Sequence, residues 1–249
     1  MATPYGYAFL PGVWQYSTGV IALRGYRLIR VQFRAPVPLD SGLRRAADII
    51  SASGQPPGAL CACELRMPAP LDEDDFISFN RRYLVALAEI GTQLHNGGNP
   101  VARTNVSPAR NELCEPSLHA FSFASPSHRA AGDFIVSGSA EVPEGLSNYR
   151  DNIVARGDVS AHGLRAKADF VLAEMGRRMG ALAVSGEVPQ AVQVYSVHDV
   201  HDVLAGSLAT NFAPPHGVTW HQARPPVAEL DYEMDCRTVS VERLEDACS

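Results

Sequence analysis

Apolar residues recur along the chain with two periods, one typical of strands and one typical of helices. β-Branched and aromatic residues crowd 13–23 and 26–33, on either side of Arg24-Gly25, and this pattern predicts a β-hairpin. The prolines in 34–38 are expected to end the second strand, because proline cannot donate to a strand ladder. Leu39, Leu43, Ala46 and Ile50 then follow at helical spacing. They predict a helix near 41–53, with Asp40-Ser41 as its N-cap.

The remainder of the first half continues with strands and a second helix. Residues 59–67 read as a buried strand. Leu71-Asp-Glu-Asp-Asp75 begins a helix, and its acidic residues lie in the first turn, where they favour the helix dipole. An aromatic stripe follows at helical spacing, and we interpret it as core. Its members are Phe76, Phe79, Tyr83, Leu87 and Ile90. A turn at 91–98, containing Gly97 and Gly98, leads to strands at 99–106 and 118–124.

The second half shows the same order of elements. Its expected elements are a strand at 132–138, a helix from about 159 to 179, a strand at 190–197, a short helix from 198, and strands at 218–223 and 230–241. In the last strand Leu230, Tyr232, Met234 and Cys236 share one face, and Asp231, Glu233, Asp235 and Arg237 share the other. The repeat predicts an α+β chain of two domains, 1–124 and 125–249, each a mixed sheet with two helices packed on one face.

Composition excludes several classes of function. The 249 residues are 46% hydrophobic and 19% charged, which is enough apolar material for a core. The net charge of −6 argues against nucleic-acid binding, which requires a clustered basic face. Lys167 is the only lysine, and its expected place on the polar side of a helix argues against Schiff-base chemistry.

The cysteines and the N-terminus bear on the compartment. The five cysteines are an odd number without a C-x-x-C pair, so neither a disulfide framework nor a zinc ribbon is indicated. They are Cys61, Cys63, Cys114, Cys236 and Cys248. The N-terminus lacks the basic and apolar regions of a signal peptide, and no apolar run reaches the roughly 20 residues of a membrane span. We expect a cytoplasmic protein that binds no membrane.

Arg103 is the first candidate for chemistry. It lies in Asn99-Pro-Val-Ala-Arg-Thr-Asn-Val106, at the expected start of a strand. A guanidinium is a planar, permanently charged fork that suits a carboxylate. The alternatives are a cap on a helix C-terminus and a surface ion pair.

Three stretches of the second half resemble the reactive intermediate deaminase family, the YjgF-like enamine/imine deaminases. They are Gly132-Asp-Phe-Ile-Val-Ser-Gly138, Val192-Gln-Val-Tyr-Ser-Val-His-Asp199 and Leu230-Asp-Tyr-Glu-Met-Asp235. In the first half, Asn99-Pro-Val-Ala-Arg-Thr104 is similar to the family's "(P/K)-A-R-(S/T)" motif. The resemblance therefore implies two tandem YjgF-like (chorismate-mutase-like) domains, and trimers with clefts between subunits.

The resemblance also implies roles for individual residues. The family's carboxylate-binding arginine falls on Arg103, its water-positioning glutamate on Glu233, and its pocket-lining Ser-Gly on Ser137-Gly138. The second copy has His216-Gly-Val-Thr-Trp220 where an arginine would stand, and the first copy has His119 where a glutamate would stand. The alternatives are a solvated strand residue for Glu233, a core histidine for His119 and a strand end for Ser137.

Further residues are candidates for binding the substrate. Trp220 and His221 are expected either in a pocket or in an interface, and Arg224 or Arg34 could take a second carboxylate. His198-x-x-His201, with Asp199 and Asp202, has ligand spacing for a metal. The family pattern has an Asp here without a metal, so we expect neither a metal site nor a cofactor.

The function implied is a hydrolytic deaminase of an enamine/imine carboxylic acid of the 2-aminomuconate type. Such chemistry needs a cation to hold the carboxylate and a carboxylate or imidazole to activate water. Arg103, Glu233 and His119 would supply these groups. The alternatives are a chorismatase-like hydrolase on the same fold and a non-catalytic protein that binds small ligands. The expected assembly is a homotrimer.

Overall fold

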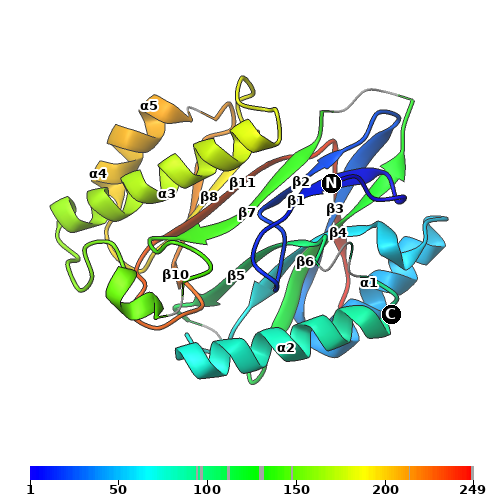
Figure 1. Ribbon diagram of the computed structural model, residues 1–249, viewed down its shortest axis with the longest axis horizontal. Helices are drawn as coiled ribbons and strands as arrows, with labels where there is room; N and C mark the ends of the chain where they lie inside the picture. The colour runs from blue at the N-terminus through cyan, green and yellow to red at the C-terminus, as the bar shows by residue number, and fades with distance from the viewer. Residues whose placement is uncertain are drawn as a thin grey trace.

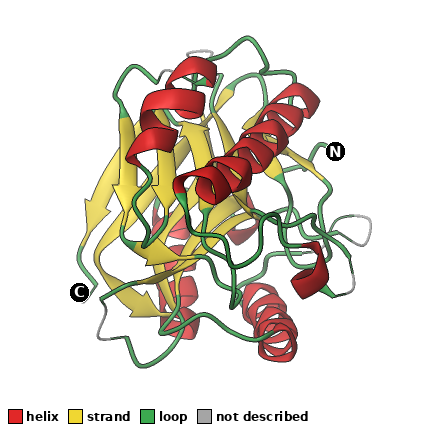
Figure 2. Ribbon diagram, turned by 90° about the vertical axis from the view of Figure 1, so that its left-hand side faces the viewer, coloured by secondary structure: helices red, strands yellow, loops and turns green. Residues whose placement is uncertain are grey.

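Two six-stranded β-sheets lie face to face, and helices pack on their outer faces (Figures 1 and 2). The structure is a computed structural model that describes residues 1–93, 95, 98–110, 113–128, 132–146, 148–212 and 214–247. Gly97 of the expected turn and Cys248 lie outside the described residues.

The first sheet carries helices α1 (Leu39–Ala52) and α2 (Glu73–Glu89) on its outer face. Its strands, in spatial order, are β10 (Ala223–Arg224), β5 (Ala102–Pro108), β4 (Leu60–Arg66), β6 (Ser117–Pro126), β3 (Tyr26–Pro38) and β12 (Val241–Glu245). The aromatic stripe of α2 packs into the core against β4 and β6, so its interpretation as core is confirmed. The Asp72 side chain accepts the Asp75 N–H and caps α2. The expected cap of α1 is wrong, because that helix begins at Leu39 directly after Pro38, without a capping side chain.

The second sheet is covered by α3 (Ala161–Ala181). Its strands, in spatial order, are β1 (Tyr7–Leu10), β2 (Gly19–Ala22), β7 (Phe134–Ala140), β11 (Glu233–Thr238), β8 (Ala191–Tyr195) and β9 (Val218–His221). The shorter helical segments are Pro57–Ala59, Tyr149–Asn152, α4 (His201–Val203), the π-helical turn Leu204–Leu208, and α5 (Ala209–Asn211). No helix among the described residues combines the length and the apolar character that crossing a bilayer requires.

The inner faces of the two sheets meet through both apolar and polar contacts. An apolar cluster joins Phe9 and Ile135 of the second sheet to Leu28 and Ala102 of the first. Beside it, the Thr104 hydroxyl donates to Asp235 Oδ2 at 2.8 Å. The polar face predicted for the last strand therefore exists, but it packs against the other sheet and is buried.

The expectation of two tandem YjgF-like domains, each with its own sheet, is wrong. Strands β1 and β2 from the first half pair within the second sheet, and β10 and β12 from the second half extend the first sheet. The expected hairpin is wrong for the same reason, since β2 pairs with β1 and β7 while β3 pairs with β6 and β12. The α+β class holds in general terms. The division of the chain at residues 124 and 125 stays a prediction, and strands from both sides of it share each sheet.

Candidate active site

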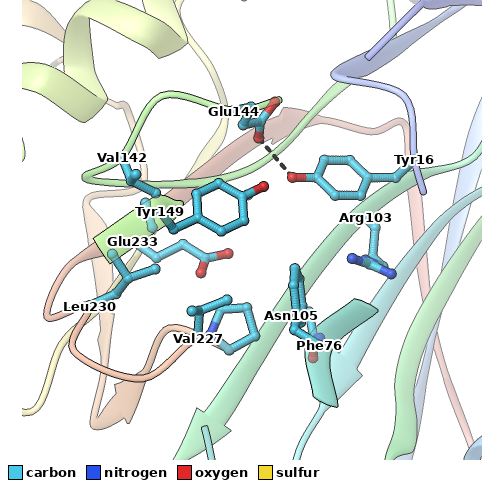
Figure 3. A pocket seen from close by; sticks show the side chains of 13 residues that line it. Tyr16, Phe76, Arg103, Asn105, Val142, Glu144, Tyr149, Val227, Leu230 and Glu233 are labelled. Atoms are coloured by element: carbon cyan, nitrogen blue, oxygen red, sulfur yellow. Dashed lines mark hydrogen bonds between the residues drawn. The ribbon is translucent and has the colours of Figure 1, made fainter. Parts of the chain in front are cut away.

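A cleft opens where β5 of the first sheet lies beside β7 and β11 of the second (Figure 3). It holds about 500 Å³ of empty space, including its open mouth. Polar side chains on its walls are Tyr16, Arg103, Asn105, Glu144, Tyr149 and Glu233. Apolar side chains cover much of the rest, among them Phe76, Val142, Val227 and Leu230. The cleft therefore combines a few directed polar groups with a mostly apolar lining, as small-molecule sites do.

Arg103 is a buried cation in a cage of aromatic rings. Its side chain is 3% exposed, and its guanidinium carbon lies 4.7 Å from the ring centre of Tyr16 and 4.9 Å from that of Tyr83. Nη1 donates to Asn80 Oδ1 at 2.8 Å, and no carboxylate among the described residues forms an ion pair with the guanidinium. A buried charge without a counter-ion is costly, so this position favours an incoming anion. Neither alternative for Arg103, a helix cap or a surface ion pair, matches this environment.

Ser137 lies directly behind this cation. Its hydroxyl accepts the Arg103 backbone N–H at 3.0 Å and donates to the Ser17 carbonyl at 2.6 Å. Both of its hydrogen bonds are therefore made to main chain, and they tie β7 to β5. The residue fixes the strand that bears Arg103.

Glu233 faces the cleft from β11 and is 4% exposed. Burial raises the pKa of its carboxyl well above the ordinary 4.5, and the nearby Asp235 carboxyl raises this pKa further, while Arg103 acts in the opposite direction. This environment favours the protonated acid. Gly138 makes room for it, because a Cβ at that position would overlap Glu233 Oε1.

A chain of contacts holds the rim of the cleft in place. The Tyr16 hydroxyl donates to Glu144 Oε1 at 2.7 Å, and Glu144 pairs with Arg178 Nη2 at 2.8 Å. Arg178, buried on α3, also donates to the Ser137 carbonyl. Figure 3 shows the hydroxyls of Tyr16 and Tyr149 pointing toward one another across the opening. These contacts join Glu144, which follows β7 in the chain, to Tyr16 and to the strand behind the cleft.

Five further candidate residues lie outside the cleft, and Ser137 is not among the residues that line it. His119 on β6 is partly buried, and burial together with the Arg66 charge lowers the pKa of its imidazole to about 3. The His221 ring stacks on Tyr195 with centres 4.9 Å apart, and Trp220 donates Nε1–H to the Ser196 carbonyl at 2.9 Å. Arg224 is exposed on β10. Arg34, the alternative for a second carboxylate, is exposed and pairs with Asp246.

The expected exposure of Lys167 is wrong. Its ammonium is fully buried and pairs with Glu141 Oε1 at 3.2 Å and Asp231 Oδ2 at 3.1 Å. Glu141 also accepts the Asp231 and Tyr232 backbone N–H groups, so this cluster secures the chain immediately before Glu233. The helix periodicity placed the lysine among polar positions but did not show that two carboxylates would enclose it.

The two histidines with metal-ligand spacing contact different carboxylates. His198 Nε2 lies 3.0 Å from Asp231 Oδ1, and His201 Nδ1 lies 2.6 Å from Asp199 Oδ1. Within the described part of the chain, no group of three or more histidine, cysteine or acidic side chains is arranged to hold a metal ion.

Comparison with known proteins decides the family. A family model described as 2-aminomuconate deaminase CnbZ matches residues 1–243. The chain belongs to the CnbZ family. This CnbZ-family chain is 38% identical over 237 residues to the 2-amino-5-chloromuconate deaminase of Comamonas testosteroni, and the match covers 94% of each protein. The chain is therefore a deaminase, which is the enzyme class that the sequence predicted.

Solved structures resemble this CnbZ-family chain in fold. A crystal structure of a chorismatase superposes with a TM-score of 0.53 at 13% identity, covering 89% of this chain and 77% of the chorismatase. Cyanuric acid hydrolase superposes with a TM-score of 0.40 at 11% identity, covering 90% of this chain and 70% of the hydrolase. The likeness to chorismatase is one of fold alone, and together with the exchange of strands between the sheets it replaces the expected tandem YjgF-like fold.

Sequence reasoning missed several residues of the cleft. Asn105 carried a usable signal, because it stands two residues after Arg103 in a strand and so shares its face. Tyr16, Glu144 and Tyr149 carried none, since no motif marks them and they reach the cleft only through tertiary contacts.

Proposed function

We propose that the protein hydrolyses a 2-aminomuconate-type enamine acid to ammonia and a 2-oxo acid. Two observations support this proposal. The family is that of 2-aminomuconate deaminases, and the cleft sets an unpaired buried cation, Arg103, against a buried acid, Glu233. The pairing of these two groups is the observation that carries the proposal.

Arg103 binds the carboxylate next to the reacting carbon. Its fork donates hydrogen bonds to the two carboxylate oxygens, and the surrounding rings strengthen the attraction by keeping water away. The incoming anion supplies the counter-ion that the guanidinium lacks in the free protein. Val142, Val227 and Leu230 offer an apolar surface for the unsaturated carbon chain.

Glu233 moves the protons. As an acid it donates its proton to the enamine carbon, and the C=C electron pair forms the new C–H bond while the nitrogen becomes an iminium. As a carboxylate it then takes a proton from water, whose oxygen bonds to the iminium carbon. Glu233, now protonated again, donates that proton to the nitrogen of the resulting carbinolamine, and the C–N bond breaks to release ammonia while the hydroxyl proton returns to Glu233. One water is thus consumed and one ammonia leaves. These steps need no cofactor.

Glu233 is favoured over His119 for this work. Glu233 lines the cleft that holds Arg103, while His119 lies elsewhere on β6 and is not among the residues that line it. The roles first suggested for Trp220, His221 and Arg224 stay predictions, as do the trimer and the cytoplasmic location.

Ammonia release from enzymatically generated 2-aminomuconate tests the proposal. We expect wild-type protein to accelerate release, and Arg103→Ala and Glu233→Gln to abolish most of that rate. Absence of acceleration by the wild type would refute the proposal. Chorismate is the comparison substrate, because the alternative of a chorismatase-like hydrolase shares the fold, and its turnover in place of 2-aminomuconate would favour that alternative.

A further inference from the structure

Asn105 is a buried amide whose two polar atoms both lack partners. The residue is 3% exposed, and neither Oδ1 nor Nδ2 has a hydrogen-bond partner among the described residues. Buried polar side chains are nearly always hydrogen-bonded, because an unpaired one keeps the full cost of leaving water. Asn105 lines the cleft, so a bound molecule can supply the missing partners.

The strand places this amide next to the carboxylate-binding cation. Arg103 and Asn105 line the same cleft from β5. They are two residues apart in this strand, so their Cα atoms are separated by roughly 6.6 Å along it. Figure 3 draws both on the side of the pocket opposite Glu233 and Leu230. A group bonded to the carbon that carries the bound carboxylate therefore falls within reach of the amide. In an enamine acid that group is the nitrogen.

We infer that Asn105 binds the nitrogen of the substrate, with Oδ1 accepting one of its N–H groups. This inference rests on the proposed function and specifies how that cleft distinguishes an amino acid from a nitrogen-free acid. The amide is neutral, so it does not compete with the substrate carboxylate for Arg103. The hydrogen bond strengthens as the nitrogen gains positive charge in the iminium, and Asn105 therefore favours the reacting state over the ground state.

Two ligands of equal length separate this role from a purely structural one. The first is 2-aminomuconate, followed by ammonia release, and the second is cis,cis-muconate, a dicarboxylate without nitrogen, measured as an inhibitor. Asn105→Leu keeps the volume and removes both polar atoms. We expect kcat/KM for 2-aminomuconate to fall about 10- to 100-fold, while the inhibition constant of muconate changes less than about threefold.

The remaining outcomes are equally decisive. If kcat/KM for 2-aminomuconate and the affinity for muconate fell by the same factor, the inference would be overturned. The amide would then bind a carboxylate or only stabilise the wall of the cleft. An unchanged kcat/KM would overturn it as well. Asn105→Ala, which also removes both polar atoms, is measured in the same way if the leucine variant does not fold. Failure of the proposed function appears separately, as a wild type that releases no ammonia.

Discussion

Gly138 and Glu233 lie so close together that the Glu233 side chain leaves no room for a side chain at position 138. A Cβ built on Gly138 would overlap Oε1 of Glu233 and would also come within 3.2 Å of the Thr104 methyl group. Glu233 is buried, and its carboxyl lies between Gly138 and the cleft that it lines. A methyl group at position 138 therefore has to displace the acid that the proposed reaction uses.

Gly138→Ala is expected to lower kcat/KM by about 100-fold, because a displacement near 1 Å of a reacting group costs about that much. Steady-state ammonia release measures the effect. Gly176→Ala is the matched control, since no atom outside its own helix lies within 4 Å of its Cβ position on α3. We expect the control to keep full activity and to gain about 0.5–1 kcal/mol of stability from helix propensity. A fully active Gly138→Ala would contradict the assignment of Glu233.

Arg103 is expected to matter for binding more than for folding. Arg103→Met removes a buried cation that has no carboxylate partner among the described residues. The free energy of unfolding should therefore stay level or rise, whereas kcat/KM should fall by about 10²–10³. Muconate should raise the melting temperature of the wild type and leave that of Arg103→Met unchanged. Arg103→Lys keeps the charge but loses the fork and the ring stacking, so we expect it to recover little activity. Equal stabilisation of both proteins by muconate would place the anion elsewhere.

Local patterns predicted the elements well and their partners poorly. The stripe from Phe76 to Leu87 and the alternation of Glu233 with Met234 are determined by neighbours in the chain, and both appear as expected. The pairing of β2 with β7 depends on residues more than a hundred positions apart, and a period-2 pattern contains no information on which strand lies alongside. The same limit produced the incorrect tandem fold.

The site was predictable to the extent that its residues lie on strands. Arg103 could be singled out because a guanidinium suits a carboxylate, and Gly138 because the resemblance placed the family's pocket-lining Ser-Gly on Ser137-Gly138. Tyr16 and Glu144 meet through a contact between residues 128 positions apart, which no local pattern reports. The burial of Glu233 follows from the packing of the two sheets against each other, so it could not be foreseen from a polar strand face.

His119 gives a test of stability rather than of catalysis. Its folded-state pKa is about 3, below the ordinary 6.5, so between these values the unfolded chain binds a proton that the native protein does not. The wild type should therefore lose stability as pH falls through this window. His119→Gln should reduce that loss by about 1–2 kcal/mol at pH 5, measured by urea unfolding at pH 7 and pH 5. We expect kcat/KM to stay within about threefold of the wild type, and a larger loss would restore His119 as a candidate base.

Glu233 should impose a pH dependence on both rate and stability. Its folded-state pKa lies well above 4.5, so from pH 4.5 up to that folded pKa the native protein holds a proton that the unfolded chain has released. The free energy of unfolding should fall as pH rises across this interval. Glu233→Gln should remove this part of its pH dependence. Because the first step uses the protonated acid, kcat/KM of the wild type should also fall as pH rises through the folded pKa. Glu233→Gln should be slower than the wild type by about 10²–10⁴, and its kcat/KM should not fall as pH rises through the interval. A wild-type kcat/KM that stays level across the interval would assign the proton donor to another group.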